Sequence, residues 1–301
     1  MHIGAVVVLD ALLFLALPFW LIYREVGALC RATLIGAPFL TIAAFLYDRY
    51  WKPRSWATLR SGSLPGLLYD LPMERHGPGA DFDPSASRNL SRKFVVGIHP
   101  HGLYPYAAGA WFTCNRRFLR FRTCVHWMLT TIPLLKEACS WGGAIDATAS
   151  VMNEHLARRD VQGLVVCPGS VREGTIEKPG TVVQRSGFIQ IAMEHKAHLV
   201  PVYDATSPAL YDIWLPLGTT CHRWLRYPWP VMAKGRSPAY LNPLPKRMTV
   251  HVYIGTPIMT ENRSLGECID AFYRQLAELR DMARRDGNLP FDEKWTTAVR
   301  K

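Results

Sequence analysis

Residues 94–112, FVVGIHPHGLYPYAAGAWF, begin with a strand of buried type and continue into a loop that contains two histidines. The run at residues 93–98 is rich in Val and Ile and has no polar alternation, which is typical of a strand covered on both faces. A helix is predicted to follow at residues 106–119. Because sites in α/β proteins form where strands end, the loop between them is the first candidate site.

His99 and His101 lie in this loop, and an imidazole held there can act as a general base near neutral pH. Pro100 restricts the backbone between them, and Gly102 allows a tight turn or a close approach to a substrate. Two alternatives stay open: the histidines serve packing or lie on the surface, or they are two ligands of a metal. The remaining metal ligands would then come from remote residues such as Cys114, Cys139 or His155.

A second strand with the same layout is predicted at residues 163–169, GLVVCPG, and it leads into SVREG at residues 170–174. If the two strands are neighbours, Glu173 can orient a histidine and support its imidazolium form, while Arg172 can meet a phosphate. Taken alone, the same residues are also compatible with a surface turn that carries a solvated Arg-Glu pair. The tertiary structure therefore has to show whether the two strands are neighbours in the sheet.

Strands and helices alternate over the rest of the chain. Further strands are predicted at residues 198–204 and 249–258, and further helices at 149–159, 188–196 and 264–285. In the last helix, Ser264 and Glu267 have the spacing of a capping box. Residues 61–92 are dense in Gly, Pro and Ser and are predicted to be a connecting stretch. The alternation predicts one α/β domain, which we place at residues 51–301.

Residues 1–50 have the pattern of a membrane-embedded helical hairpin. Residues 3–23 are 21 residues long with one charge, about 30 Å as a helix, and 32–47 form a shorter apolar run. A basic, aromatic flank follows at residues 48–60, which predicts by the positive-inside rule that the larger domain faces the cytoplasm. A cleaved signal peptide is the alternative, although no Lys or Arg precedes the apolar run.

The 301-residue chain is 49% hydrophobic with a mean hydropathy of +0.01, which excludes a disordered chain. Its net charge of +11 favours anionic partners, but no recognisable nucleic-acid-binding motif is present, so nucleic acid is not an expected partner. The seven cysteines are an odd number without a CxxC pair, which favours a reducing compartment. No metal and no other cofactor is expected.

Four segments in this order, IHPHG, PGSVREG, QRSGFIQIAMEHKAHLVPVY and IGTPI, resemble the type-2 diacylglycerol acyltransferase family, which includes monoacylglycerol and wax-ester acyltransferases. The resemblance covers roughly residues 66–285. It implies a mixed sheet flanked by helices, as in glycerolipid acyltransferases, with the N-terminal membrane hairpin. It also implies acyl transfer from acyl-CoA, as co-substrate, to a lipid hydroxyl.

The resemblance also implies which residues form the site. His99, His101 and Glu173 would be catalytic, with His101 favoured as the base and His99 positioning or donating. The residues expected to bind substrates are Gly102, Gly169, Arg172, Lys178, Arg185, Gly187 and Phe188. Ser170 stands where the family usually has a second glycine, and Tyr203-Asp204-Ala205-Thr206 replaces the usual continuation after LVPV.

The expected reaction is the esterification of diacylglycerol to triacylglycerol at the endoplasmic reticulum membrane or the lipid-droplet surface. The alternative within enzymes is a monoacylglycerol, wax-ester or lysophospholipid acyltransferase. Outside enzymes, the alternative is a membrane-tethered protein that binds acyl lipids without turnover. The Trp- and Pro-rich stretch at residues 213–234 is either an interfacial loop or a buried aromatic loop. The choice of acceptor and the formation of a homodimer stay open.

Overall fold

A computed structural model describes residues 71–86, 89, 91–109, 115–131, 135–170, 172–176, 181–215, 232–236 and 245–290. The predicted hairpin at residues 1–50 lies outside these residues, as do Cys114 and Lys178. Within the described part of the chain, no helix has both the length and the apolar character needed to span a bilayer.

Seven strands form the main sheet in the order β1-β9-β6-β2-β5-β3-β4. All neighbouring pairs are parallel except β6 and β9, so the sheet is mixed, as expected. A separate two-stranded antiparallel sheet joins β7 to β8. The strands are β1 (Met73–His76), β2 (Phe94–His99), β3 (Phe121–Val125), β4 (Ala144–Asp146), β5 (Gly163–Val166), β6 (His198–Asp204), β7 (Asp212–Trp214), β8 (Met232–Lys234) and β9 (Val250–Ile254).

The strand β2 lies inside the sheet, between β5 and β6, and all six of its residues are buried. Its side chains alternate between two apolar layers: Val95 belongs to one cluster, and Val96 and Ile98 belong to the other. Gly97 leaves room for two rings, because a Cβ there would lie 2.6 Å from Phe272 Cζ and 3.0 Å from Phe188 Cε2. The absence of polar alternation in the sequence thus reflects burial on both faces.

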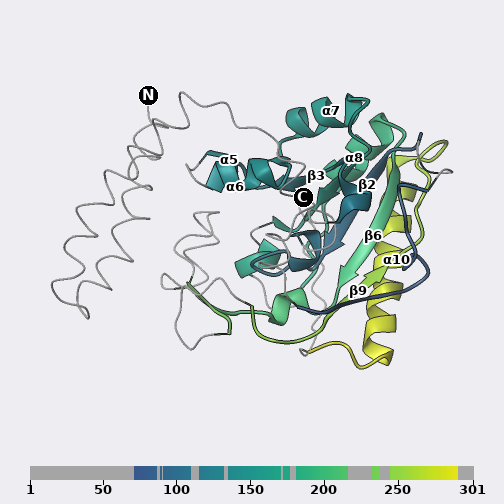
Figure 1. The fold of residues 1–301 in the computed structure, drawn as a ribbon. Helices are drawn as coiled ribbons and strands as arrows, with labels where there is room; N and C mark the ends of the chain where they lie inside the picture. The colour runs from purple at the N-terminus through teal and green to yellow at the C-terminus, as the bar shows by residue number, and fades with distance from the viewer. Residues whose placement is uncertain are drawn as a thin grey trace, which may run out of the picture.

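The helices are α5 (Trp127–Thr131), α6 (Leu135–Trp141), α7 (Ala149–Ala157), α8 (Gly187–Glu194) and α10 (Leu265–Arg285). Residues of α7, α8 and α10 share one core cluster on the same face of the sheet, and Figure 1 shows α10 lying along β6 and β9. The predicted capping box starts α10: Ser264 Oγ accepts the Glu267 N–H, and the Glu267 carboxylate accepts the Ser264 N–H. Cys268, Phe272 and Leu276 are buried on its inner face.

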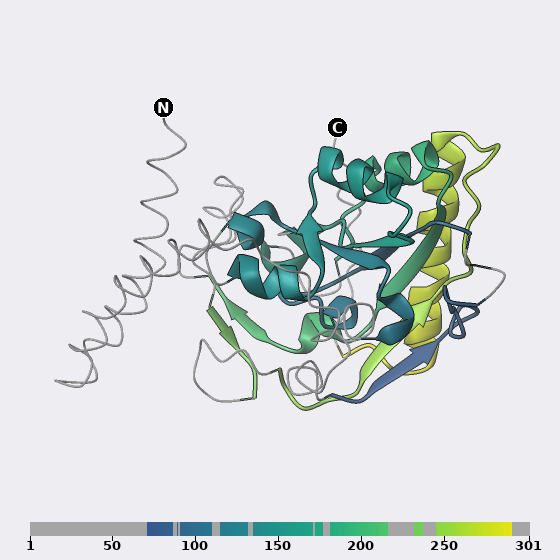
Figure 2. The ribbon, with the colours of Figure 1, turned by 45° about the horizontal axis from the view of Figure 1, so that its top comes forward.

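The second core cluster covers the other face, where Phe82 and Phe118 pack on Phe94 and Phe121 of the sheet. Among the described residues, short 3-10 turns at Arg116–Phe118 and Ser207–Ala209 contribute to this layer or adjoin it. Figure 2 shows the sheet between this layer and the helices above it. The architecture is therefore α/β with a mixed sheet between two apolar layers.

All four predicted strands are present with boundaries shifted by a few residues at most, and the helices α7, α8 and α10 match their predicted ranges. Two predictions are wrong. The stretch 61–92 is not only a connection, because it contains β1, which pairs with β9. The helix predicted through Leu119 does not extend that far: the Asn115 side chain accepts the Arg117 N–H and starts a separate 3-10 turn.

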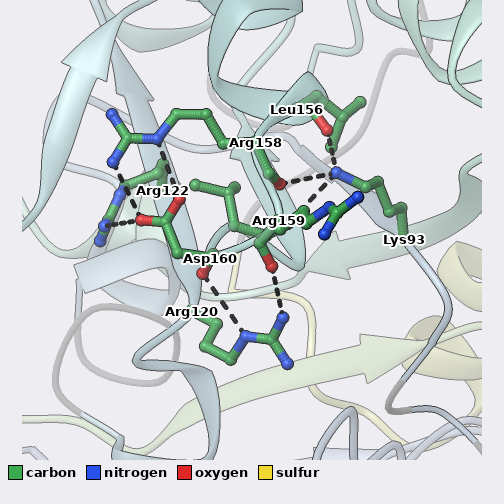
Figure 3. A network of polar contacts seen from close by, with 8 residues as sticks. Lys93, Arg120, Arg122, Leu156, Arg158, Arg159 and Asp160 are labelled. Atoms are coloured by element: carbon green, nitrogen blue, oxygen red, sulfur yellow. Dashed lines mark hydrogen bonds and ion pairs between the residues drawn. The ribbon is translucent and has the colours of Figure 1, made fainter.

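A network of basic side chains joins the amino ends of β2, β3 and β5 (Figure 3). The Lys93 ammonium donates to the Leu156 carbonyl, to the Arg158 carbonyl at 2.9 Å and to the Val161 carbonyl at 3.4 Å. Arg158 forms two bonds of 3.0 Å with the Asp160 carboxylate. Lys93 therefore satisfies carbonyl groups at the end of α7, where a helix leaves them without internal partners.

We expect Lys93→Met to destabilise the fold by about 1–3 kcal/mol, since the change leaves partly buried carbonyls without a donor. Chemical denaturation of the purified protein measures this loss. Lys196→Met is the control, because Lys196 is an exposed lysine of the turn after α8. An equal loss of stability in both variants would contradict the role assigned to Lys93.

Candidate active site

The candidate site lies at the carboxyl ends of β2 and β5, which are paired in parallel with Gly97 opposite Val166. The neighbour relation that the sequence left open is therefore confirmed. His99 is the last residue of β2, and β5 leads through Gly169 into the single turn at Arg172–Ile176, which carries Glu173. The two loops meet because parallel strands place their ends at the same edge of a sheet.

His99 and Glu173 form a buried pair. His99 Nδ1 lies 2.5 Å from Glu173 Oε1, and both side chains are fully inaccessible to solvent. The same carboxylate oxygen accepts the Val183 N–H at 2.6 Å. A carboxylate accepts and does not donate, so Nδ1 of His99 carries the proton and Nε2 of the neutral ring is the basic nitrogen. Among the described residues, Nε2 has no hydrogen-bond partner.

His101 is held by the same second loop through a different contact. Its Nε2–H donates to the Ser170 carbonyl at 2.9 Å, so Nδ1 is the basic nitrogen of its neutral ring. His101 is 6% exposed, and burial lowers its pKa below the ordinary value, although the Glu173 charge opposes this shift. The lowered pKa favours the neutral form of the His101 imidazole.

The glycines around Glu173 are required by space. A Cβ on Gly169 would lie 1.8 Å from Glu173 Cδ, and one on Gly174 would lie 2.8 Å from the Gly102 carbonyl oxygen. Gly102 has φ +65° and packs against the turn Ser207–Ala209, with 2.7 Å between its hypothetical Cβ and Ser207 O. Gly102 therefore has a left-handed φ that suits glycine, and it lies close to the protein's own backbone at Ser207.

Ser170 has φ +51°, a left-handed conformation that suits glycine. A glycine, which the resemblance implies at this position, would adopt this φ without strain. Its carbonyl still holds His101, so the serine side chain is not needed for that contact.

Ser170→Gly should stabilise the protein by about 0.5–1 kcal/mol, because the strain of a left-handed serine exceeds the entropic cost of glycine. The activity of the protein should be unchanged, since the backbone carbonyl that holds His101 remains. The free energy of unfolding and the turnover rate check both parts. Ser186→Gly serves as the control, because Ser186 has φ −109° and should gain nothing. Equal stabilisation of the two variants would refute the explanation.

The RSGF segment at residues 185–188 is tied to His99 through α10. The Tyr273 hydroxyl accepts the Arg185 N–H at 2.7 Å and donates to the Arg185 carbonyl at 2.9 Å. The Tyr273 ring centroid lies 5.8 Å from that of His99. Phe188 is buried against Phe272 in the core, and Gly187 is exposed as the first residue of α8. The structure thus places Phe188 in a packing position.

The expected phosphate-binding cations belong to separate segments of the chain. Arg172 begins the turn that carries Glu173, while Arg185 lies before α8 and Lys178 is outside the described residues. An open hollow of about 470 Å³ runs along α10 beside Tyr273, lined also by Gln184, Arg274 and Arg280. Neither His99 nor His101 lines this hollow, so it lies apart from the two candidate histidines.

Three groups of the site escaped the sequence analysis: the Ser170 carbonyl, the Val183 N–H and Tyr273. Backbone groups carry no sequence signal, and Tyr273 is separated from His99 by more than half the chain. Asp204, at the end of β6, is also buried here; its Oδ1 accepts the Ser207 N–H at 2.9 Å, and burial raises its pKa to about 6. Its position after LVPVY was the available signal.

Among the described residues, neither His99 nor His101 belongs to a group of three metal-ligating side chains. The contacts that both histidines do make, to a carboxylate and to a carbonyl, fix their tautomers. An arrangement of this kind can serve as an oriented base next to a second imidazole.

Comparison with known proteins adds the following findings. The family profile described as diacylglycerol acyltransferase matches residues 85–283. The chain is 28% identical over 206 residues to mouse 2-acylglycerol O-acyltransferase 1, covering 59% of this chain and 58% of that protein. It is 26% identical over 188 residues to mouse acyl-CoA wax alcohol acyltransferase 2, covering 56% of each.

Diacylglycerol O-acyltransferase 2 of Xenopus laevis is 26% identical over 125 residues, which cover 38% of this chain and 35% of that protein. The chain thus spans little more than half the length of the mouse relatives. A solved structure, the 1-acyl-sn-glycerophosphate acyltransferase PlsC from Thermotoga maritima, matches with a TM-score of 0.42 and 16% identity over 89% of this chain and 95% of that one. That score supports no conclusion about function.

Proposed function

Because the chain belongs to the diacylglycerol acyltransferase family, we propose that it transfers the acyl group of acyl-CoA to a lipid hydroxyl, foremost that of diacylglycerol. The observation that carries this proposal is the buried pair of His99 and Glu173 at the carboxyl ends of β2 and β5. A thioester is already activated, so the protein has only to remove the hydroxyl proton and stabilise the developing oxyanion.

In the proposed reaction, His99 Nε2 takes the proton of the acceptor hydroxyl while the oxygen attacks the thioester carbon. The tetrahedral intermediate then collapses, the C–S bond breaks, and the imidazolium returns its proton to the leaving thiolate. The products are the ester and free CoA. Glu173 keeps Nδ1 protonated and stabilises the imidazolium. Backbone N–H groups near Gly102 or Gly169 are the proposed oxyanion donors.

The sequence favoured His101 as the base, whereas the carboxylate contact supports His99. We therefore assign His101 to positioning the acceptor through its Nδ1, which is an acceptor in the tautomer that the Ser170 carbonyl imposes. A neutral His101 avoids a second positive charge next to the imidazolium of His99.

The similarity to a 2-acylglycerol and a wax alcohol acyltransferase supports monoacylglycerol and long-chain alcohols as alternative acceptors. Transfer of labelled acyl groups from acyl-CoA to a panel of these lipids, diacylglycerol and a lysophospholipid identifies the acceptor. Ester formed by the wild type and not by His99→Ala supports the proposal. Folded protein that binds acyl-CoA but esterifies no acceptor would instead identify a non-catalytic lipid-binding protein.

We also propose that the domain works at the cytoplasmic face of the endoplasmic reticulum membrane or at a lipid droplet, held by residues 1–50. Two exposed tryptophans support a membrane-facing side: Trp127 of α5 is 45% exposed and Trp214 of β7 is 49% exposed. Figures 1 and 2 place α5 and the β7–β8 hairpin on the side away from α10. The exposure of Trp214 favours the interfacial interpretation of residues 213–234 at this position.

Replacing both Trp127 and Trp214 with serine should raise the KM for a vesicle-borne acceptor about tenfold, the effect of ~1.4 kcal/mol of lost apolar burial. The kcat at saturation should stay the same, because neither residue touches the site. Steady-state kinetics on vesicles test this, with Met259→Ser as the exposed apolar control. An unchanged KM would rule out these two residues as membrane contacts.

A further inference from the structure

A second cluster of titratable side chains lies at the edge of the sheet, outside the catalytic loops. It consists of Glu74 and His76 from β1 and His251 from β9, which we term the edge cluster. The two strands are parallel neighbours, with Glu74 opposite His251 and His76 opposite Tyr253. Residues two apart on a strand share a face, so the pairing brings all three side chains together.

The ligand atoms of the edge cluster have the spacing of a metal site. His76 Nε2 lies 3.1 Å from His251 Nδ1, while Glu74 Oε2 lies 3.8 Å from the former and 3.5 Å from the latter. Adjacent corners of a tetrahedron with metal–ligand bonds of 2.0–2.1 Å are about 3.3–3.4 Å apart. The three observed distances bracket this value, so an ion can be bound with small side-chain shifts.

The edge cluster is held in place by neighbouring side chains and is accessible to solvent. The His76 ring stacks on Tyr253 with 4.7 Å between centroids, and the Tyr253 hydroxyl donates to Asp286 Oδ2 at 2.8 Å. The His76 ring is thereby held with its Nε2 near His251 Nδ1. The side chains of Glu74, His76 and His251 are 60%, 27% and 19% exposed, which leaves an entry path and room for a water ligand.

We propose that Glu74, His76 and His251 bind a divalent transition-metal ion, Zn²⁺ by preference, with water as the fourth ligand. Two imidazoles and one carboxylate suit Zn²⁺, whereas Mg²⁺ and Ca²⁺ prefer oxygen ligands alone. The ion clamps the edge strand β1 to β9. The backbone N–H of His251 donates to Thr206 Oγ1, and the His251 carbonyl accepts the Ala205 N–H. The metal site is therefore connected through the backbone of β9 to the segment that follows Asp204.

The test uses the tag-free full-length chain in detergent, stripped with a chelator and titrated with Co²⁺. A saturable visible absorption of tetrahedral Co²⁺ that Zn²⁺ abolishes, together with a melting temperature that rises with Zn²⁺, is the expected result. His76→Gln and His251→Gln should each weaken binding by more than the ~10–100-fold that follows the loss of an outer-shell partner. Absence of a saturable signal in folded wild type would overturn the proposal.

Two further variants make the result specific to this cluster. Glu74→Gln should also weaken metal binding. Because it changes a largely exposed side chain, it tests the site even if the histidine variants fold poorly. His195→Gln removes a half-buried imidazole that bonds Asn153 elsewhere in the fold, and it should leave binding unchanged. Binding that survives His76→Gln, His251→Gln and Glu74→Gln but is lost in His101→Ala would place the ion at the catalytic loop and refute the edge site.

Discussion

We expect Glu173→Gln to lower kcat for acyl transfer about 10³–10⁴-fold. This loss is comparable to the one seen when a histidine base loses its carboxylate partner. The amide keeps the volume of the carboxyl group and can still accept the Val183 N–H. The amide oxygen in the place of Oε1 also still accepts the His99 Nδ1–H, because one oxygen makes both contacts. It carries no negative charge, however, so the imidazolium that forms when His99 takes the hydroxyl proton is no longer stabilised.

The control for this variant is Glu137→Gln, which changes another buried glutamate in α6. Steady-state kinetics at saturating acceptor, with thermal unfolding to verify the fold, measure both variants. A Glu173→Gln enzyme within tenfold of the wild type would show that the carboxylate is structural and that His99 acts without it.

Alanine variants of His99 and His101 show which of the two histidines is the general base. Under our proposal, His99→Ala abolishes turnover, and His101→Ala raises KM for the acceptor more than it lowers kcat. The opposite split would return the base to His101, as the sequence favoured.

Gly169→Ala should cost at least about 10²-fold in kcat, the size of effect that a 1 Å misplacement of a catalytic group produces. The new methyl carbon would lie 1.8 Å from the Glu173 carboxyl carbon, and the glutamate side chain has to move away from His99. Overpacking of this kind also lowers the free energy of unfolding by about 1–3 kcal/mol. Kinetics and chemical denaturation of the same preparation measure the two effects.

Gly266→Ala is the matched control for Gly169→Ala. Gly266 lies in the first turn of α10, where its hypothetical Cβ meets nothing closer than Ser264 Oγ at 4.0 Å. The same substitution there should leave activity unchanged and stabilise the helix by up to about 1 kcal/mol. A Gly169→Ala enzyme with full activity would mean that Glu173 reaches His99 from a different backbone position.

The sequence by itself determined the central strands, the last helix and the two loops of the site. The runs at 93–98, 163–169 and 198–204 are apolar on both faces because they lie in the interior of the sheet, so their pattern is visible without tertiary information. The capping box of α10 is equally local, since both partners lie within four residues. Short strands such as β1 and β8 left no comparable pattern, because three or four residues at an edge need little apolar content.

Only the tertiary structure decided which groups meet. That Glu173 contacts His99 rather than His101 depends on the parallel pairing of β2 with β5 and on the left-handed backbone at Ser170, which turns its carbonyl toward His101. The contact of Tyr273 with Arg185 and the approach of His76 to His251 join residues 88 and 175 positions apart. Such contacts depend on strand order and on backbone direction, and neither is encoded in the local periodicity from which a single sequence is interpreted.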